Sequence, residues 1–177
     1  MGGYMKLFVR QLCRKPFIRT QVWFEVYDEN NRLKYNIWIK AGIIKYEIII
    51  ADNKEIVASI KPTDSLEEYY IVKMAEKTIR IDKEIDELLC RKENIRLEGE
   101  SVFYDYGLFR GDDIIAKIWR RQYFKIAELD IEFDDPADEI AALVFAVMLI
   151  VDEAGDQSKV DKVSNLIWRL SLPRPLW

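Results

Sequence analysis

The chain has 177 residues and a formal net charge of −4; half of its residues are hydrophobic and a third are charged. This composition is typical of a folded globular domain and argues against a disordered chain. The chain contains no histidine, which excludes catalysis by Ser-His or Cys-His pairs and any histidine-ligated metal. Carboxylate, lysine or tyrosine chemistry stays open, but no catalytic motif is present, so we expect no enzyme, no cofactor and no metal.

Alternating apolar and polar residues predict a long series of short strands before residue 134. The clearest is Thr20 to Asp28, with Val22, Phe24 and Val26 on one face; an acidic turn and a returning strand, Leu33 to Lys40, follow. The same unit of strand, acidic turn and strand recurs along the chain. The other predicted strands are Met5–Arg10, Ile43–Ala51, Glu55–Lys61, Tyr69–Met74, Thr78–Asp82, Asn94–Gly99, Ser101–Phe109, Ile114–Arg120 and Tyr123–Phe133.

Part of this series has an ambiguous pattern. Leu66 to Lys77 can be read as helical, and the spacing of apolar residues in Lys83 to Glu93 fits a short helix nearly as well as a strand. With a strand there, the count is about twelve. The strand register between residues 62 and 98 is left open.

A hydrophobic helix is predicted over residues 136 to 153. Asp135 suits the N-cap, Pro136 the first helical position, and Asp138 and Glu139 the first turn, while Gly155 suits the position after the helix. From Ile140 to Val151 no side chain is polar, so this helix must be buried on all sides. At about 18 Å the run is shorter than the ~30 Å membrane interior, so we expect no transmembrane segment.

A helix without a polar face restricts how the strands can be arranged. A ring of about eight strands fills with its own side chains, whereas a wider ring leaves a lumen. We therefore predict a mainly β fold: a closed antiparallel barrel of about twelve strands that encloses the helix. The alternative, a two-sheet sandwich with the helix outside, would leave part of the helix's apolar surface in water. The predicted domain covers residues 1–155.

Residues 156–177 are predicted to form a C-terminal helical extension. Val160, Val163, Ile167 and Leu170 share one helical face. This segment could pack on its own barrel, or it could bind a partner or a membrane through Trp168 and Trp177.

The densest group of carboxylates is Asp130, Glu132 and Asp134, which share one strand face. A hard cation such as Ca²⁺ could find oxygen ligands there. The alternative is that these carboxylates form a solvated strand face that leads into the helix cap. We favour this alternative and predict no metal site.

Basic residues are unevenly distributed. Residues 1–50 carry nine Lys/Arg against four Asp/Glu, a net +5, and the remainder carries −9. A basic part of this kind could face an anionic membrane, unless its charges are spread over separate strand faces. No segment interleaves basic and aromatic residues, so nucleic acid is not an expected partner. No secretory signal precedes Met5, and Cys13 and Cys90 stand too far apart to indicate a disulfide framework, so we expect a cytoplasmic protein.

Several segments, taken in order, match the pattern of a known family. They are Met5–Gln11, Phe24–Ile37, Tyr46–Ile60, Ile114–Arg121, Leu129–Ile131 and the helix from Asp135 to Asp152. In these segments the chain resembles the LURP-one-related, tubby C-terminal-like family, which also includes the phospholipid scramblases. The resemblance implies a twelve-stranded barrel around a hydrophobic C-terminal helix. It also implies binding of phosphoinositide head groups by basic surface residues, although no specific motif transfers.

The predicted function is therefore a non-enzymatic binding module that recognises anionic phospholipid head groups, peripheral to a membrane. The alternative is a protein–protein interaction or scaffold role through residues 156–177. The predicted ligand-binding residues are Arg14, Lys15, Arg19, Arg120 and Arg121.

Overall fold

A computed structural model describes residues 4–11, 22–41, 46–63, 69–75, 77–84, 87–100, 105–123 and 126–150. The chain divides into two compact units, Met1–Ala146 and Val147–Trp177. The first unit holds all the strands and the first part of the helix, and it is the unit described below. The predicted boundary at residue 155 and the extension over 156–177 lie outside the described residues.

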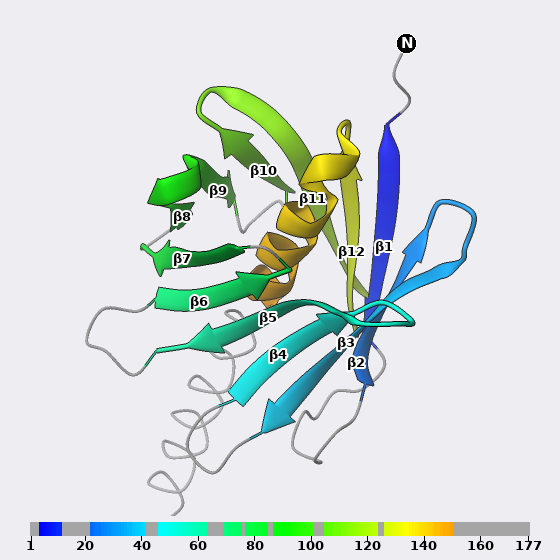
Figure 1. The fold of residues 1–177 in the computed structure, drawn as a ribbon. Coiled ribbons are helices and arrows are strands. Elements are labelled where there is room, and N and C mark those ends of the chain that lie inside the picture. The colour runs from blue at the N-terminus through cyan, green and yellow to red at the C-terminus, as the bar shows by residue number, and fades with distance from the viewer. Residues whose placement is uncertain are drawn as a thin grey trace, which may run out of the picture. The chain divides into compact units, whose positions relative to one another are not determined.

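Twelve antiparallel strands form a closed barrel in which each strand pairs with its neighbours in sequence (Figure 1). Closure comes from the pairing of β1 with β12, which sets Met5 opposite Phe133 and Arg10 opposite Glu128. The barrel confirms the strand number and the closed topology predicted from the sequence. The strands are β1 Met5–Gln11, β2 Val22–Asp28, β3 Leu33–Ala41, β4 Tyr46–Ala51, β5 Ile56–Pro62, β6 Tyr69–Met74, β7 Lys77–Lys83, β8 Leu88–Cys90, β9 Ile95–Glu100, β10 Asp105–Arg110, β11 Asp113–Tyr123 and β12 Ile126–Phe133.

The ambiguous stretch Lys83 to Glu93 contains both of the predicted structures. The short strand β8 pairs with β7 and β9, and a 3-10 turn, η1 Arg91–Glu93, follows it. Leu88 and Cys90 point inward and are buried. Because β8 is only three residues long, its apolar spacing resembles that of a helical turn, which explains the ambiguity of the sequence pattern.

Inward-facing residues alternate along each strand, as a barrel requires. On β2, Phe24 and Val26 are completely buried, as predicted, and on β3 Ile37 is too. The acidic turns that join the hairpins are stabilised by their own side chains. The Asp28 carboxylate accepts bonds from the backbone amides of Asn30 and Arg32, each at 2.9 Å.

The helix starts where the sequence predicts. The Asp135 carboxylate accepts a bond from the Ala137 amide at 2.9 Å, Pro136 begins a 3-10 turn, η2 Pro136–Asp138, and α-helix follows from residue 139 to residue 150. Residues 151–153 lie outside the described residues. Within the part of the chain that the structure describes, no helix is long and apolar enough to cross a membrane.

The helix is buried on every side. The five consecutive residues Ala142 to Ala146 are each at most 1% exposed. At about 100° per residue, five residues cover the whole helix circumference. Figure 1 shows this part of the helix surrounded by strands. This burial fits the barrel and not the sandwich alternative, in which one side of the helix would be wet.

Candidate functional site

Of the five predicted ligand-binding residues, Arg14, Lys15 and Arg19 lie outside the described residues. Arg120 and Arg121 belong to β11, where the strand register sets them opposite Leu129 and Glu128. Their side chains also lie outside the described part of the structure. The convergence of these five residues on one ligand therefore stays a prediction.

The register places Arg121 and the end of β1 at the same level of the barrel. Arg10 on β1 lies opposite Glu128 on β12, and Glu128 lies opposite Arg121 on β11. Gln11, the last described residue before position 12, follows Arg10 directly. An acidic side chain also lies at this end of the barrel, since Glu128 Oε1 is 3.6 Å from Arg10 Nε.

The predicted acidic strand face contains an ion pair with the neighbouring strand. Glu132 pairs with Lys6 on β1, which lies opposite it, and its other neighbour in the register is Lys117 on β11. Asp130 takes part in a further interaction, and Asp134 is exposed beside the helix cap. No three carboxylate or thiol side chains of the described residues lie close enough to hold a metal ion. The Glu132 carboxylate of this strand face is therefore engaged in a salt bridge.

A different group of cations lies on the outer face of strands β3 to β7. We call it the basic face: Lys40, Lys61, Lys73 and Arg80, with the acids Glu47 and Asp82 among them. Lys61 pairs with Glu47 at 3.3 Å, and Arg80 pairs with Asp82. Lys40 and Lys73 are exposed and form no ion pair with any described residue. Two cations on this face are thus available to a ligand.

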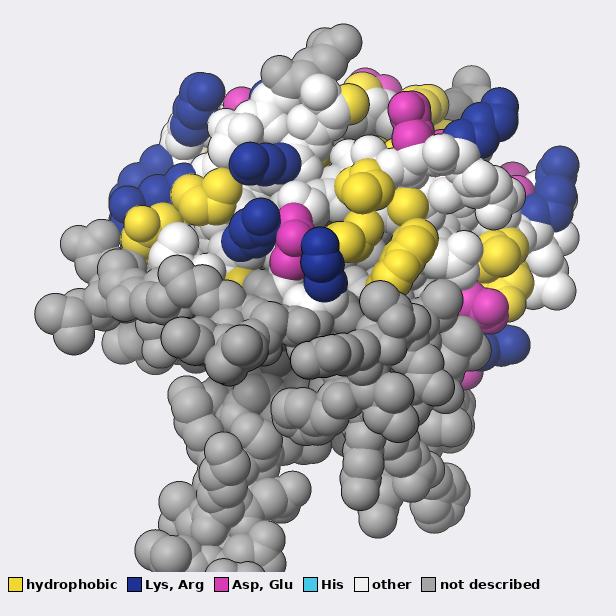
Figure 2. Space-filling model, turned by 60° about the horizontal axis from the view of Figure 1, so that its bottom comes forward, with side chains coloured by type: hydrophobic (Ala, Val, Ile, Leu, Met, Phe, Trp, Pro, Cys, Tyr) yellow, Lys and Arg dark blue, Asp and Glu magenta, His cyan; other side chains and the backbone are white. Residues whose placement is uncertain are grey.

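Apolar side chains separate these cations. The register sets Trp38 opposite Ile49, and sets Ile71 between Lys61 and Arg80. The Arg80 guanidinium lies over the Tyr69 ring, 3.9 Å from its centre. Figure 2 brings the lower side of Figure 1 forward, where Lys and Arg side chains flank an acidic one and hydrophobic side chains lie among them. The sequence analysis missed this grouping, although the outward positions of the predicted strands already carried these residues.

Two acidic side chains at the start of the helix, Asp138 and Glu139, are buried inside the barrel. Glu139, 9% exposed, accepts a bond from the Tyr35 hydroxyl at 2.6 Å and pairs with Lys34. Asp138, 4% exposed, pairs with Arg110 at 2.5 Å. The sequence placed both acids in the first turn of the helix, which is correct, but it did not show that they tie the helix start to β3 and β10.

These contacts change how Tyr35 ionises. Burial is the main reason that its pKa is raised well above the ordinary tyrosine value, and the hydrogen bond to Glu139 raises it further. The neutral hydroxyl is therefore a permanent donor to the carboxylate. This cluster anchors the helix, and its groups are fully engaged with one another.

Comparisons with known proteins support the fold alone. No family model and no curated protein matches the chain. The X-ray structure of an Arabidopsis thaliana protein, AT5G01750, is similar, with a TM-score of 0.56 and 14% sequence identity. The match covers 85% of this chain and 93% of that one. Thus the barrel with its helix is an arrangement that a solved structure shares, at an identity too low to transfer a function.

Proposed function

We propose that this protein is a non-enzymatic binding module that recognises anionic phospholipid head groups, peripheral to a cytoplasmic membrane surface. The observation that carries the proposal is the basic face, where Lys40 and Lys73 are exposed without an ion-pair partner among the described residues. Trp38 and Tyr69 on the same face suit the boundary between head groups and acyl chains, where amphipathic rings are favoured.

The size of the expected attraction agrees with a peripheral protein. Each Lys or Arg near an anionic membrane contributes about 1 kcal/mol. The basic face carries four cations and two acids, so its excess charge contributes about 2 kcal/mol, or about 30-fold in partitioning. This is weak and reversible binding, which further cations would strengthen.

Arg14, Lys15, Arg19, Arg120 and Arg121 are the proposed additional cations. Lys40 lies near the end of β3, two residues beyond Trp38, which pairs with Val22 at the start of β2. The described residues that flank 12–21 are thus close in register to the basic face. This supports a single lipid-binding surface, and the resemblance to tubby-like and LURP-one-related proteins agrees with it.

Vesicle co-sedimentation tests the proposal. The fraction bound to phosphatidylcholine vesicles should rise when a phosphoinositide is added, and the Lys40→Glu/Lys73→Glu variant should lose this rise. The matched control is Lys54→Glu/Lys92→Glu, which makes the same change in charge at two exposed lysines outside the basic face and should behave as the unmodified chain does. No rise with the anionic lipid, or an equal loss in both variants, would contradict the proposal.

A further inference from the structure

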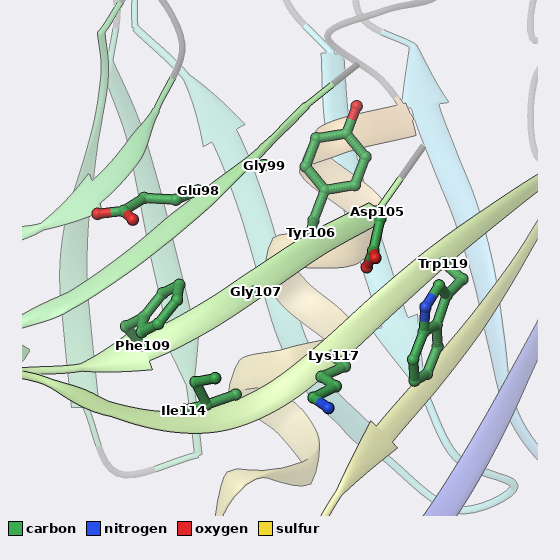
Figure 3. A pocket seen from close by; sticks show the side chains of 9 residues that line it. All are labelled: Glu98, Gly99, Asp105, Tyr106, Gly107, Phe109, Ile114, Lys117 and Trp119. Atoms are coloured by element: carbon green, nitrogen blue, oxygen red, sulfur yellow. The ribbon is translucent and has the colours of Figure 1, made fainter. Parts of the chain in front are cut away.

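A groove of about 670 Å³ lies on the outer face of β9, β10 and β11 (Figure 3). Its centre is Gly107, which the register sets opposite Glu98 on β9 and Lys117 on β11. Because glycine has no side chain, the Phe109 ring can lie over Gly107 and border the groove there. We call the space the Gly107 hollow. It is lined by Glu98, Gly99, Asp105, Tyr106, Gly107, Phe109, Ile114, Lys117 and Trp119.

One side of the hollow is an apolar wall in which the charges are already paired. A methyl group added at Gly107 would lie only 2.7 Å from the Phe109 ring, so this ring already fills the space above the glycine. The Arg96 guanidinium stacks on the other part of the Phe109 ring, 4.9 Å from its centre, and pairs with Glu98. Ile114 extends this wall and is 51% exposed.

The other side carries two charges of opposite sign without partners. Asp105 lies directly opposite Trp119, and Lys117 is two residues from Trp119 on the same face of β11. Both charged side chains are exposed, and neither forms an ion pair or a side-chain hydrogen bond with any described residue. Figure 3 shows the Asp105 carboxylate directed toward β11, with Lys117 and Trp119 extending from the same side of that strand.

This arrangement selects against ligands of a single charge. An anion would meet Asp105 and Glu98 beside its one favourable partner, and a cation would meet Lys117. We infer that the Gly107 hollow binds a small zwitterion of the phosphocholine type, with its quaternary ammonium at Trp119 and Asp105 and its phosphate at Lys117. A quaternary ammonium has no N–H to donate and is attracted to an aromatic face and a nearby carboxylate, while a phosphate accepts bonds from a lysine ammonium.

The dimensions suit such a ligand. Trp119 and Lys117 are separated by two residues along a strand, or about 7 Å. A choline phosphate is compact, and the long Lys117 side chain can close the remaining gap. The choline methyl groups would contact the Trp119 ring, whereas the Phe109 ring over Gly107 would border the phosphate end of the ligand beside Lys117. The hollow lies on other strands than the basic face, so this inference does not rest on the proposed function.

Titration with soluble phosphocholine, followed by tryptophan fluorescence, tests the inference. The full chain should show saturable binding at millimolar concentrations, and Asp105→Asn, Lys117→Met and Trp119→Leu should each weaken it about tenfold. Gly107→Val would clash with the Phe109 ring and push it into the hollow, so it should abolish binding. Lys54→Met, at an exposed lysine outside both the basic face and the Gly107 hollow, is the matched control and should bind as the unmodified chain does.

The other tryptophans also contribute to the fluorescence signal, so the affinities should be measured by calorimetry as well. Thermal melting should confirm that each variant is folded. Choline alone and inorganic phosphate alone should bind at least several-fold more weakly than phosphocholine. Retention on pure phosphatidylcholine vesicles that Lys117→Met abolishes would identify a lipid as the source, and binding of the soluble ester without retention would identify a free ester. The inference would be overturned by an absence of saturable binding, or by folded Asp105→Asn and Lys117→Met variants that bind phosphocholine as tightly as the unmodified chain does. Inorganic phosphate that binds as tightly as phosphocholine would also overturn it.

Discussion

The buried acidic side chains in the interior of the barrel are paired with cations, whereas two lysines on its outer basic face have no ion-pair partner among the described residues. Inside, Asp138 and Glu139 are almost fully buried, and each has a cation from the barrel wall. Outside, Lys40 and Lys73 are exposed and form no ion pair with a described residue. A buried charge without a partner is costly, whereas an exposed lysine is solvated by water at little cost.

This difference separates charges that hold the fold from charges that are free to bind. The interior pairs join the helix start to β3 and β10, so altering them should change the stability of the protein. Lys40 and Lys73 on the basic face form no ion pair with a described residue, so altering these two lysines should change binding and leave the fold intact. The predictions below test this division from the largest expected effect to the smallest.

Phe145→Asp should prevent folding. Phe145 is completely buried in the helix, and the substitution would place a carboxylate there without a cation, at a cost that exceeds the usual stability of a domain of this size. Circular dichroism should show no cooperative thermal transition. Ile49→Asp on the outer face is the matched control and should lower the melting midpoint only modestly; a soluble Phe145→Asp variant that melts cooperatively would refute the buried helix.

Arg110→Ala should destabilise the fold by about 2 kcal/mol. It leaves Asp138 buried without a cation; loss of one partner of a buried pair costs about 3–5 kcal/mol, and we take a lower figure because Arg110 is half exposed. Denaturant unfolding measures the change. Lys77→Ala breaks the more exposed pair with Glu93 and should cost at most about 1 kcal/mol.

A double-mutant cycle shows whether the cause is the unpaired acid. Asp138→Asn in the Arg110→Ala background should recover part of the lost stability, because the neutral amide is cheaper to bury. Additive effects of the two substitutions would mean that Asp138 and Arg110 do not stabilise each other.

The barrel and helix could be predicted because periodicity shows which face of each element is buried. Phe24 and Val26 alternate with polar residues, and the run from Ile140 onward has no polar face, so only an enclosing fold accommodates both. The cap at Asp135 was predictable for a related reason, because capping depends on residues next to one another in the chain.

The pairing of charges could not be predicted in this way. Lys34 and Glu139 are 105 positions apart, and a sequence pattern gives the face of an element without giving its rotation against the barrel wall. The Gly107 hollow shows the same limit. A glycine within a strand indicates a close approach or an open position, but the neighbours Glu98 and Lys117 follow only from the register of three strands.

The stability of the protein should fall at alkaline pH because of Tyr35. Its pKa is raised in the folded state, mainly by burial, so folding favours the protonated hydroxyl. Stability from this group is fully present below the ordinary tyrosine pKa of about 10 and is lost as the pH rises above it. Unfolding free energies measured between neutral pH and about pH 11 should decline less steeply in Tyr35→Phe; identical slopes would exclude Tyr35 as the cause.

The smallest effect is expected at an exposed turn, where Asp52 caps the hairpin between β4 and β5. Its carboxylate accepts bonds from the amides of Lys54 at 2.7 Å and Glu55 at 2.9 Å, and these bonds lower its pKa. A lowered folded-state pKa means that this stabilisation is present above the ordinary aspartate pKa of about 4 and is lost as the pH falls through the folded value. Asp52→Asn keeps a side-chain acceptor and should shift the melting midpoint little at neutral pH, whereas Asp52→Ala should lower it slightly. Because a charged acceptor is the stronger one, the difference between the unmodified chain and Asp52→Asn should shrink as the pH falls below about 4, and a difference that does not depend on pH would show that the carboxylate charge contributes nothing to this turn.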